Sequence, residues 1–186
     1  MKILSYVFSA LGLLSLGYWA VEVGRGRLYQ VHEGRHFAEQ LPVSRPADVL
    51  SRPSAGSAIA MLTIPRLGLS AVVVEGAEER ELRLGPGHIR GTSLPGNGGN
   101  VGIAGHRDTF FRPLRFIRRN DTIKMTTQDQ ARWYEVISTE IVSPDEIRVL
   151  RPTERETLTL VTCYPFNFVG SAPKRFIVQA VCVNCS

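Results

Sequence analysis

The sequence predicts an all-β domain that follows one apolar N-terminal helix. From residue 58 onward, short segments rich in β-branched and aromatic residues recur, and Gly, Pro, Asn and Asp separate them. Residues 3–21 differ from all that follows, because they contain no charge. At least seven such segments in about 130 residues favour a closed β-barrel or a sandwich, and the pattern alone does not choose between these.

The apolar segment at residues 3–21 is long enough to cross a bilayer. As a helix, 19 residues span roughly the 30 Å of a hydrocarbon core. Tyr18 and Trp19 lie near one end, where interfacial aromatic residues are favoured. We expect residues 1–24 to be an uncleaved signal anchor with the following domain exported. A cleaved signal peptide is the alternative, although no clear A-x-A cleavage pattern follows.

A polar segment and a linker are expected at residues 25–57. Residues 42–57 hold three prolines, four serines and one glycine, a composition typical of an extended stalk. The folded domain is expected at 58–186. Within it we expect strands at 59–64, 69–74, 100–105, 121–126, 131–142, 157–162 and 175–183. Helical turns are expected near 78–84, 110–117 and 144–150.

Charge and cysteine content exclude some classes of function. The net charge of +5 is spread along the chain, with acidic residues mixed in, so we expect no nucleic-acid partner. Three cysteines do not make the even-numbered disulfide framework of a small secreted protein. No acidic cluster announces a calcium site, and we expect no cofactor and no bound metal. An odd thiol outside the cytoplasm is either reactive or inert.

Cys163 and Arg175 are the first candidates for chemistry. Cys163 ends the strand expected at 157–162, and Arg175 opens the next strand. If these strands pair as a hairpin, the end of one lies beside the start of the other. A guanidinium there could stabilise a thiolate, or the oxyanion formed when that thiolate attacks a carbonyl.

A cysteine nucleophile needs a base, and four histidines are available. His32 and His36 belong to the juxtamembrane segment. His88 lies in the glycine-rich turn GPGHIRGT, whereas His106 ends the strand NVGIAG. A residue at a strand end is typically presented at the rim of a sheet, so position favours His106 and keeps His88 as the alternative.

Two other interpretations use the same residues. Cys182 and Cys185 form C-x-x-C, and with Cys163 and His106 they could make a Cys₃His zinc site or, on their own, a terminal disulfide. The chain could also be an anchored, non-catalytic β-barrel binding module with structural cysteines, because a buried cysteine often acts only as a small apolar residue. Resistance of Cys163 to alkylation would favour that class.

The motifs, taken together in order and spacing, resemble the sortase family, most closely its class D group. The resemblance covers roughly residues 57–183. Its carriers are IPRLGL, GPGHIRGT, GNVGIAGHRDTFFRPL, TLVTCYPF and APKRFIVQA. It implies a closed eight-stranded β-barrel with short helices, preceded by one transmembrane helix.

The resemblance also implies an activity and a site. Members of the family are membrane-anchored cysteine transpeptidases that cleave an LPxTG-like sorting signal after its threonine and pass the acyl group to an amine. By motif, the catalytic histidine falls on His106, the nucleophile on Cys163 and the arginine on Arg175. Thr162 would help to shape or support the oxyanion site. Implied partners are secreted proteins with such signals and an amine acceptor, either a cell-wall peptide or a pilin lysine.

Overall fold

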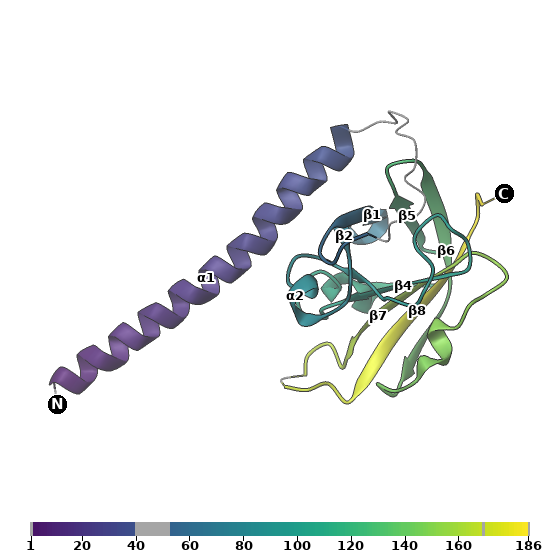
Figure 1. Ribbon diagram of the computed structural model, residues 1–186. Helices are drawn as coiled ribbons and strands as arrows, with labels where there is room; N and C mark the ends of the chain where they lie inside the picture. The colour runs from purple at the N-terminus through teal and green to yellow at the C-terminus, as the bar shows by residue number, and fades with distance from the viewer. Residues whose placement is uncertain (1, 40–52, 169, 186) are drawn as a thin grey trace.

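The computed structural model describes residues 2–39, 53–168 and 170–185. One long helix lies beside a closed β-barrel (Figure 1). The sequence prediction of an all-β domain behind one apolar helix is therefore confirmed, and the choice between barrel and sandwich is decided. Most of the predicted linker at 42–57 falls outside the described residues.

Helix α1 spans Lys2–Glu39, which is 38 residues. At 1.5 Å per residue it is about 57 Å long. Its section Tyr6–Gly34 is long and apolar enough to cross a membrane. The large apolar side chains near its N-terminal end are exposed, as a lipid-facing surface requires. The helix therefore continues well beyond the apolar segment from which it was predicted.

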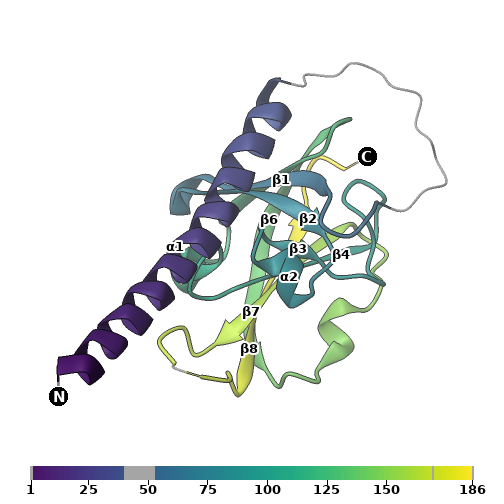
Figure 2. The same ribbon diagram turned by 60° about the vertical axis from the view of Figure 1, so that its left-hand side comes forward.

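The C-terminal half of α1 is fastened to the barrel (Figure 2). The Gln30 carboxamide accepts a hydrogen bond from Val72 N at 2.7 Å and donates to Val72 O at 3.1 Å and Leu84 O at 2.8 Å. Tyr29 Oη donates to Gly56 O at 3.0 Å. Gly26 lies so close to Arg83 O that a Cβ there would come within 2.7 Å of it. A side chain at residue 26 would thus push the helix off the barrel.

The barrel has eight strands in the order β1-β2-β3-β4-β7-β8-β6-β5. The strands are β1 (Ala58–Ile64), β2 (Leu69–Glu75), β3 (Gly87–His88), β4 (Asn100–Gly105), β5 (Thr122–Thr126), β6 (Ala131–Val142), β7 (Thr157–Tyr164) and β8 (Lys174–Cys182). Seven of them match the predicted segments within two residues. The eighth, β3, has only two residues and is too short to leave a periodic pattern.

Most neighbouring strands are antiparallel, but β4 and β7 run parallel, as do β2 and β3. The β4–β7 pairing matters most, because it brings the C-terminal ends of two strands to one edge of the barrel. Side chains alternate between the interior and the outer face. The interior is filled mainly by β-branched and aliphatic residues, among them Leu62, Ile64, Ile103, Ile123, Leu158, Leu160 and Val178.

Four short helical turns connect the strands: η1 (Pro65–Leu67), α2 (Glu79–Leu82), η2 (Arg112–Phe116) and η3 (Ile147–Leu150). Arg66 of η1 forms a bidentate ion pair with Asp121, which precedes β5, and also donates to Phe116 O at 2.6 Å. The hydrogen bonds from Arg66 hold the pKa of the Asp121 carboxyl below its usual value. This contact ties the β1–β2 and β4–β5 connections together.

Candidate active site

The candidate site is one edge of the barrel, where β4 and β7 end and β8 begins. In the parallel pair, Gly105 is opposite Thr162, so the next residues along each strand, His106 and Cys163, follow side by side. In the antiparallel pair, Cys163 is opposite Arg175. Neighbouring strands are about 4.8 Å apart. The pairing of the strands therefore brings the backbone positions of all three predicted catalytic residues together.

His106 is held by the tight turn that follows β4. Its carbonyl accepts a hydrogen bond from Phe111 N at 3.0 Å, and the Phe111 ring is fully buried. That ring packs directly on Gly105, where an added Cβ would come within 2.6 Å of it. Glycine at residue 105 therefore lets the chain fold back on itself so that His106 remains at the rim.

Cys163 lies on the outer face of β7. Along this strand Leu158, Leu160 and Thr162 point into the barrel. Cys163 is the next residue, so its side chain points to the other face of the strand; it is partly exposed and carries a free thiol. Thr162, which is 2% exposed, donates its hydroxyl to Gly105 O at 2.7 Å. Its side chain therefore joins the ends of β7 and β4 and supports the alignment of Cys163 with His106.

Arg175 is half-buried at the start of β8. Its Nη1 donates to Ala172 O at 3.2 Å and to Lys174 O at 3.0 Å. Within the residues that the structure describes, no carboxylate lies within 4 Å of its guanidinium nitrogens. Its charge is thus not neutralised by an ion pair with any described residue, and it belongs to the residue directly opposite Cys163.

Among the described residues, the imidazole of His106 has one distant ion-pair partner. Its Nε2 lies 3.9 Å from Glu79 Oε2, and the two side chains are 31% and 67% exposed. An ion pair so long and so well solvated contributes little. This contact therefore does little to fix the orientation of the ring.

His88, the alternative base, lies elsewhere and is fully engaged. It is opposite Ile103, three residues before His106 on β4, and is 2% exposed. Its Nδ1 lies 2.7 Å from Glu75 Oε2 and its Nε2 lies 3.0 Å from Ser93 O. A pocket of about 300 Å³ opens beside it, lined also by Pro53, Arg90 and Leu94. Both ring nitrogens serve the fold, and neither faces Cys163.

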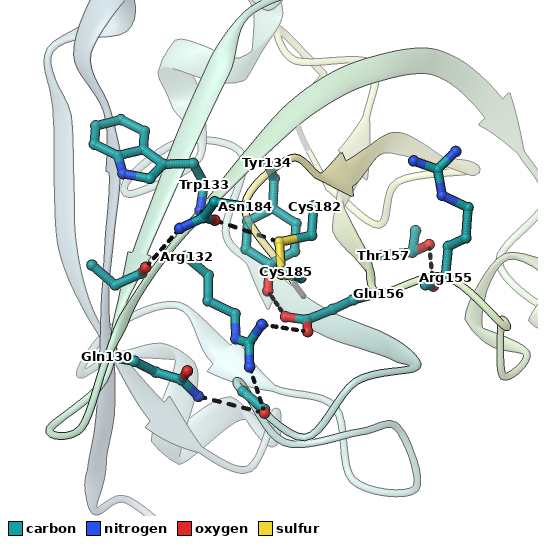
Figure 3. The surroundings of a disulfide bond; sticks show 12 residues. Gln130, Arg132, Trp133, Tyr134, Arg155, Glu156, Thr157, Cys182, Asn184 and Cys185 are labelled. Atoms are coloured by element: carbon teal, nitrogen blue, oxygen red, sulfur yellow. Dashed lines mark hydrogen bonds and ion pairs between the residues drawn. A yellow bond between two sulfur atoms is a disulfide. The ribbon is translucent and has the colours of Figure 1, made fainter.

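The other end of β8 holds the remaining cysteines. Cys182 and Cys185 form a disulfide there (Figure 3). Cys182 is seven residues beyond Arg175 on the same strand, so the cysteine pair and the Cys163 rim lie at opposite ends of the barrel. The alternative of a Cys₃His zinc site shared with Cys163 and His106 is therefore excluded. The terminal disulfide, which the same pattern allowed, is what the structure has.

One residue at the rim was not singled out from the sequence. Arg107, directly after His106, donates from Nη2 to Phe168 O at 2.7 Å and to Gly170 O at 2.9 Å. Its guanidinium also lies 5.9 Å from the centre of the Phe168 ring. The two acceptors are main-chain carbonyls more than 60 residues away, which leave no pattern in the sequence.

Comparison with known proteins identifies the family. Residues 62–183 match the sortase domain family. Sortase D of Bacillus subtilis (strain 168) is 35% identical over 128 residues, which are 68% of this chain and 65% of that protein. Sortase SrtE1 of Streptomyces coelicolor is 32% identical over 129 residues, 59% of this chain and 37% of that protein. The matched region thus spans less than two thirds of the length of either relative.

Solved structures agree with this assignment. The Clostridium perfringens sortase D5 transpeptidase superposes with a TM-score of 0.72 at 27% identity, covering 87% of this chain and 99% of that one. Sortase C-1 of Actinomyces oris superposes with a TM-score of 0.63 at 30% identity, covering 69% and 76% of the two chains. The chain belongs to the sortase family and resembles its class D members.

Proposed function

We propose that the protein is a membrane-anchored cysteine transpeptidase that cleaves an LPxTG-like sorting signal after its threonine. Cys163 is the nucleophile, His106 the general acid and base, and Arg175 the cation that binds the oxyanion. The observation that carries the proposal is the strand register at the rim. Cys163, a free and partly exposed cysteine, is opposite Arg175 in the β7–β8 ladder, and His106 follows β4 directly beside it.

The reaction takes two steps. The Cys163 thiolate attacks the carbonyl carbon of the Thr–Gly bond, and the C–N bond breaks as protonated His106 gives its proton to the departing amine. This leaves a thioester on Cys163. An incoming amine then attacks the thioester carbonyl and loses a proton to His106, and the C–S bond breaks to return the thiolate. In both steps Arg175 stabilises negative charge on the carbonyl oxygen.

The competing function is an anchored barrel that binds but does not catalyse. Three features favour the enzyme: Cys163 is not in a disulfide, it is partly exposed, and Arg175 beside it has no carboxylate partner among the described residues. A structural cysteine would be expected in the barrel interior, where Leu158 and Leu160 lie. We assign Thr162 a supporting role at the oxyanion site, and its hydrogen bond to Gly105 O, which joins the ends of β7 and β4, supports this assignment.

Intact-protein mass spectrometry tests the chemistry. The full chain in detergent is mixed with LPxTG-type peptides, and the expected result is a mass increase equal to the peptide cut after threonine, absent in Cys163→Ala. If no peptide gives an adduct and Cys163 also resists iodoacetamide, the non-catalytic barrel is correct. If no peptide gives an adduct but Cys163 reacts, the thiol site is right and the sorting signal differs from LPxTG.

The same proposal places the catalytic domain outside the cytoplasm. Within the described part of the chain, α1 is the one helix long and apolar enough to span a membrane, and its N-terminal part carries the exposed apolar surface. In both views the β7–β8 connection points toward the side on which the N-terminal end of α1 lies (Figures 1 and 2). The partners are then secreted proteins that bear the signal, together with a cell-wall peptide or pilin lysine as acceptor. If a C-terminally fused reporter that works only in the cytoplasm proved active, this topology would be refuted.

A further inference from the structure

The connection between β7 and β8, described at residues 165–168 and 170–173, joins the two strands that carry Cys163 and Arg175. We call it the β7–β8 loop. The strand ends on either side of it are held by aromatic packing. The rings of Tyr164, Phe166 and Phe176 contact one another, with centroids 5.4 to 6.4 Å apart. Among the described residues of the loop, this ring packing does not extend beyond Phe166, and the middle of the loop is attached in another way.

That attachment is Arg107. A single nitrogen, Nη2, donates to the carbonyls of Phe168 and Gly170, and the guanidinium packs near the Phe168 ring. The loop is thereby tied to the residue that follows His106. Cys163 and Arg175 lie at the two ends of this loop. The Arg107 side chain therefore connects the loop between these two residues with the chain that carries His106.

The way Arg107 is bonded distinguishes this role from ordinary stabilisation of the fold. Its other terminal nitrogen, Nη1, is buried and makes no hydrogen bond within the described residues. Across that same part of the chain no carboxylate lies within 4 Å of its guanidinium. An arginine that serves folding normally uses its planar fork on an acidic or bidentate partner. Here all the hydrogen bonds go to the loop.

We propose that Arg107 is a positioning residue that holds the β7–β8 loop in the shape that receives the sorting-signal peptide. This inference rests on the proposed transpeptidase function. Arg107 touches none of the reacting atoms; it acts through the loop. Removing it should therefore loosen the loop and weaken productive binding of the peptide, while the thiol of Cys163 keeps its own reactivity.

The test compares Arg107→Ala, Arg107→Lys and wild type, all as full chains in detergent. We expect Arg107→Ala to raise KM for an LPxTG-type peptide about tenfold, with kcat less affected, because a misplaced binding segment weakens orientation. Hydrogen exchange of the amides at 165–173 should rise, and alkylation of Cys163 should stay within about twofold of wild type. Arg107→Lys should restore most of both losses, since one ammonium can make the two bonds that Nη2 makes.

Arg112→Ala is the matched control, because Arg112 is an exposed cation five residues along the same connection. It should change neither KM nor loop exchange. The proposal is overturned if Arg107→Ala behaves like Arg112→Ala, or if it lowers kcat alone with unchanged loop exchange. A wild-type protein that forms no acyl-enzyme and whose Cys163 resists iodoacetamide would refute the proposed function. In that case loop exchange in Arg107→Ala would by itself decide whether Arg107 holds the loop.

Discussion

The two ends of β8 carry similar residues in opposite states. At its start lie Arg175, a free cysteine at residue 163 and a histidine with one loose partner. At its other end, Cys182 is oxidised to a disulfide with Cys185, and an arginine is paired with a carboxylate. We call the end of β8 at Arg175 the open end, because Cys163 there is a free thiol. We call the end at Cys182 the closed end, because its side chains are joined by a disulfide and by polar bonds.

The closed end is a connected network (Figure 3). Glu156 accepts from Tyr134 Oη at 2.5 Å and pairs with Arg132 Nη1 at 3.1 Å. Asn184, inside the disulfide ring, accepts from Trp133 N at 2.7 Å and donates to Ala131 O at 3.2 Å. The disulfide thus keeps the chain end bonded to β6. These bonds lie at the far end of β8 from the rim, where the Cys163 thiol is free and Arg175 bonds main-chain carbonyls and has no carboxylate partner among the described residues.

The largest expected effect comes from His106. His106→Gln should lower turnover by about 10³-fold with an unchanged melting temperature, because in the proposed mechanism His106 is the group that moves the proton. His88→Gln should do the reverse: it disturbs the buried bonds to Glu75 and Ser93 and lowers the melting temperature, with turnover per folded molecule within about threefold of wild type. Thermal denaturation and peptide turnover should be measured on both variants. If His88→Gln lost turnover and His106→Gln lost stability, the assignment of His106 as the base would be reversed.

Arg175→Lys should have the next largest effect. It keeps the charge but loses the fixed fork of donors, so we expect turnover to fall about 10²-fold while the melting temperature hardly changes. Alkylation of Cys163 by iodoacetamide should be little altered. Arg107→Lys, by contrast, is expected to remain active. Wild-type turnover in Arg175→Lys would show that point charge alone is enough at the rim.

The sequence predicted the open end of β8 better than the closed end. Strand patterns placed Cys163, His106 and Arg175 at strand ends, and the predicted hairpin put Arg175 beside Cys163. Only the family resemblance implied that His106 belongs to the same site. The His106–Cys163 proximity depends on β4 lying beside β7, which no local pattern reveals, because the two strands are more than 50 residues apart.

Other features left no trace in the sequence for a physical reason. Gln30 and Arg107 bind main-chain carbonyls, and every residue type offers such a carbonyl. The C-x-x-C pattern allowed a disulfide, a zinc site or no order at all. Only the direction of β8, which carries Cys182 away from Cys163, excludes the shared zinc site.

Removing the disulfide should affect stability and spare activity. Cys182→Ser with Cys185→Ser is expected to cost about 2 kcal/mol, the small amount that closure of a short loop supplies. The melting temperature should fall by several degrees while turnover stays within about twofold of wild type. A thiol reductant should lower the melting temperature of wild type in the same way and have no effect on the double variant. A comparable loss of turnover would mean that the two ends are coupled.

The smallest expected effect is that of Tyr134→Phe on the free energy of unfolding. Its dependence on pH distinguishes the contribution of the phenol from that of packing. Burial, and then the hydrogen bond to Glu156, raise the pKa of the Tyr134 phenol well above its ordinary value of 10.0. A raised pKa in the folded state means that the phenol stabilises the fold fully below pH 10, and that this contribution declines as pH rises above 10, where the unfolded chain loses its proton first.

Tyr134→Phe should therefore lower the free energy of unfolding by about 1–2 kcal/mol at pH 7, since it leaves one oxygen of a nearly buried carboxylate without its donor. The difference from wild type should narrow above pH 10, which urea denaturation at pH 7, 9 and 10.5 would measure. A difference independent of pH would mean that the phenol contributes by packing alone. Turnover at pH 7 should not change, because Tyr134 lies at the closed end of the barrel.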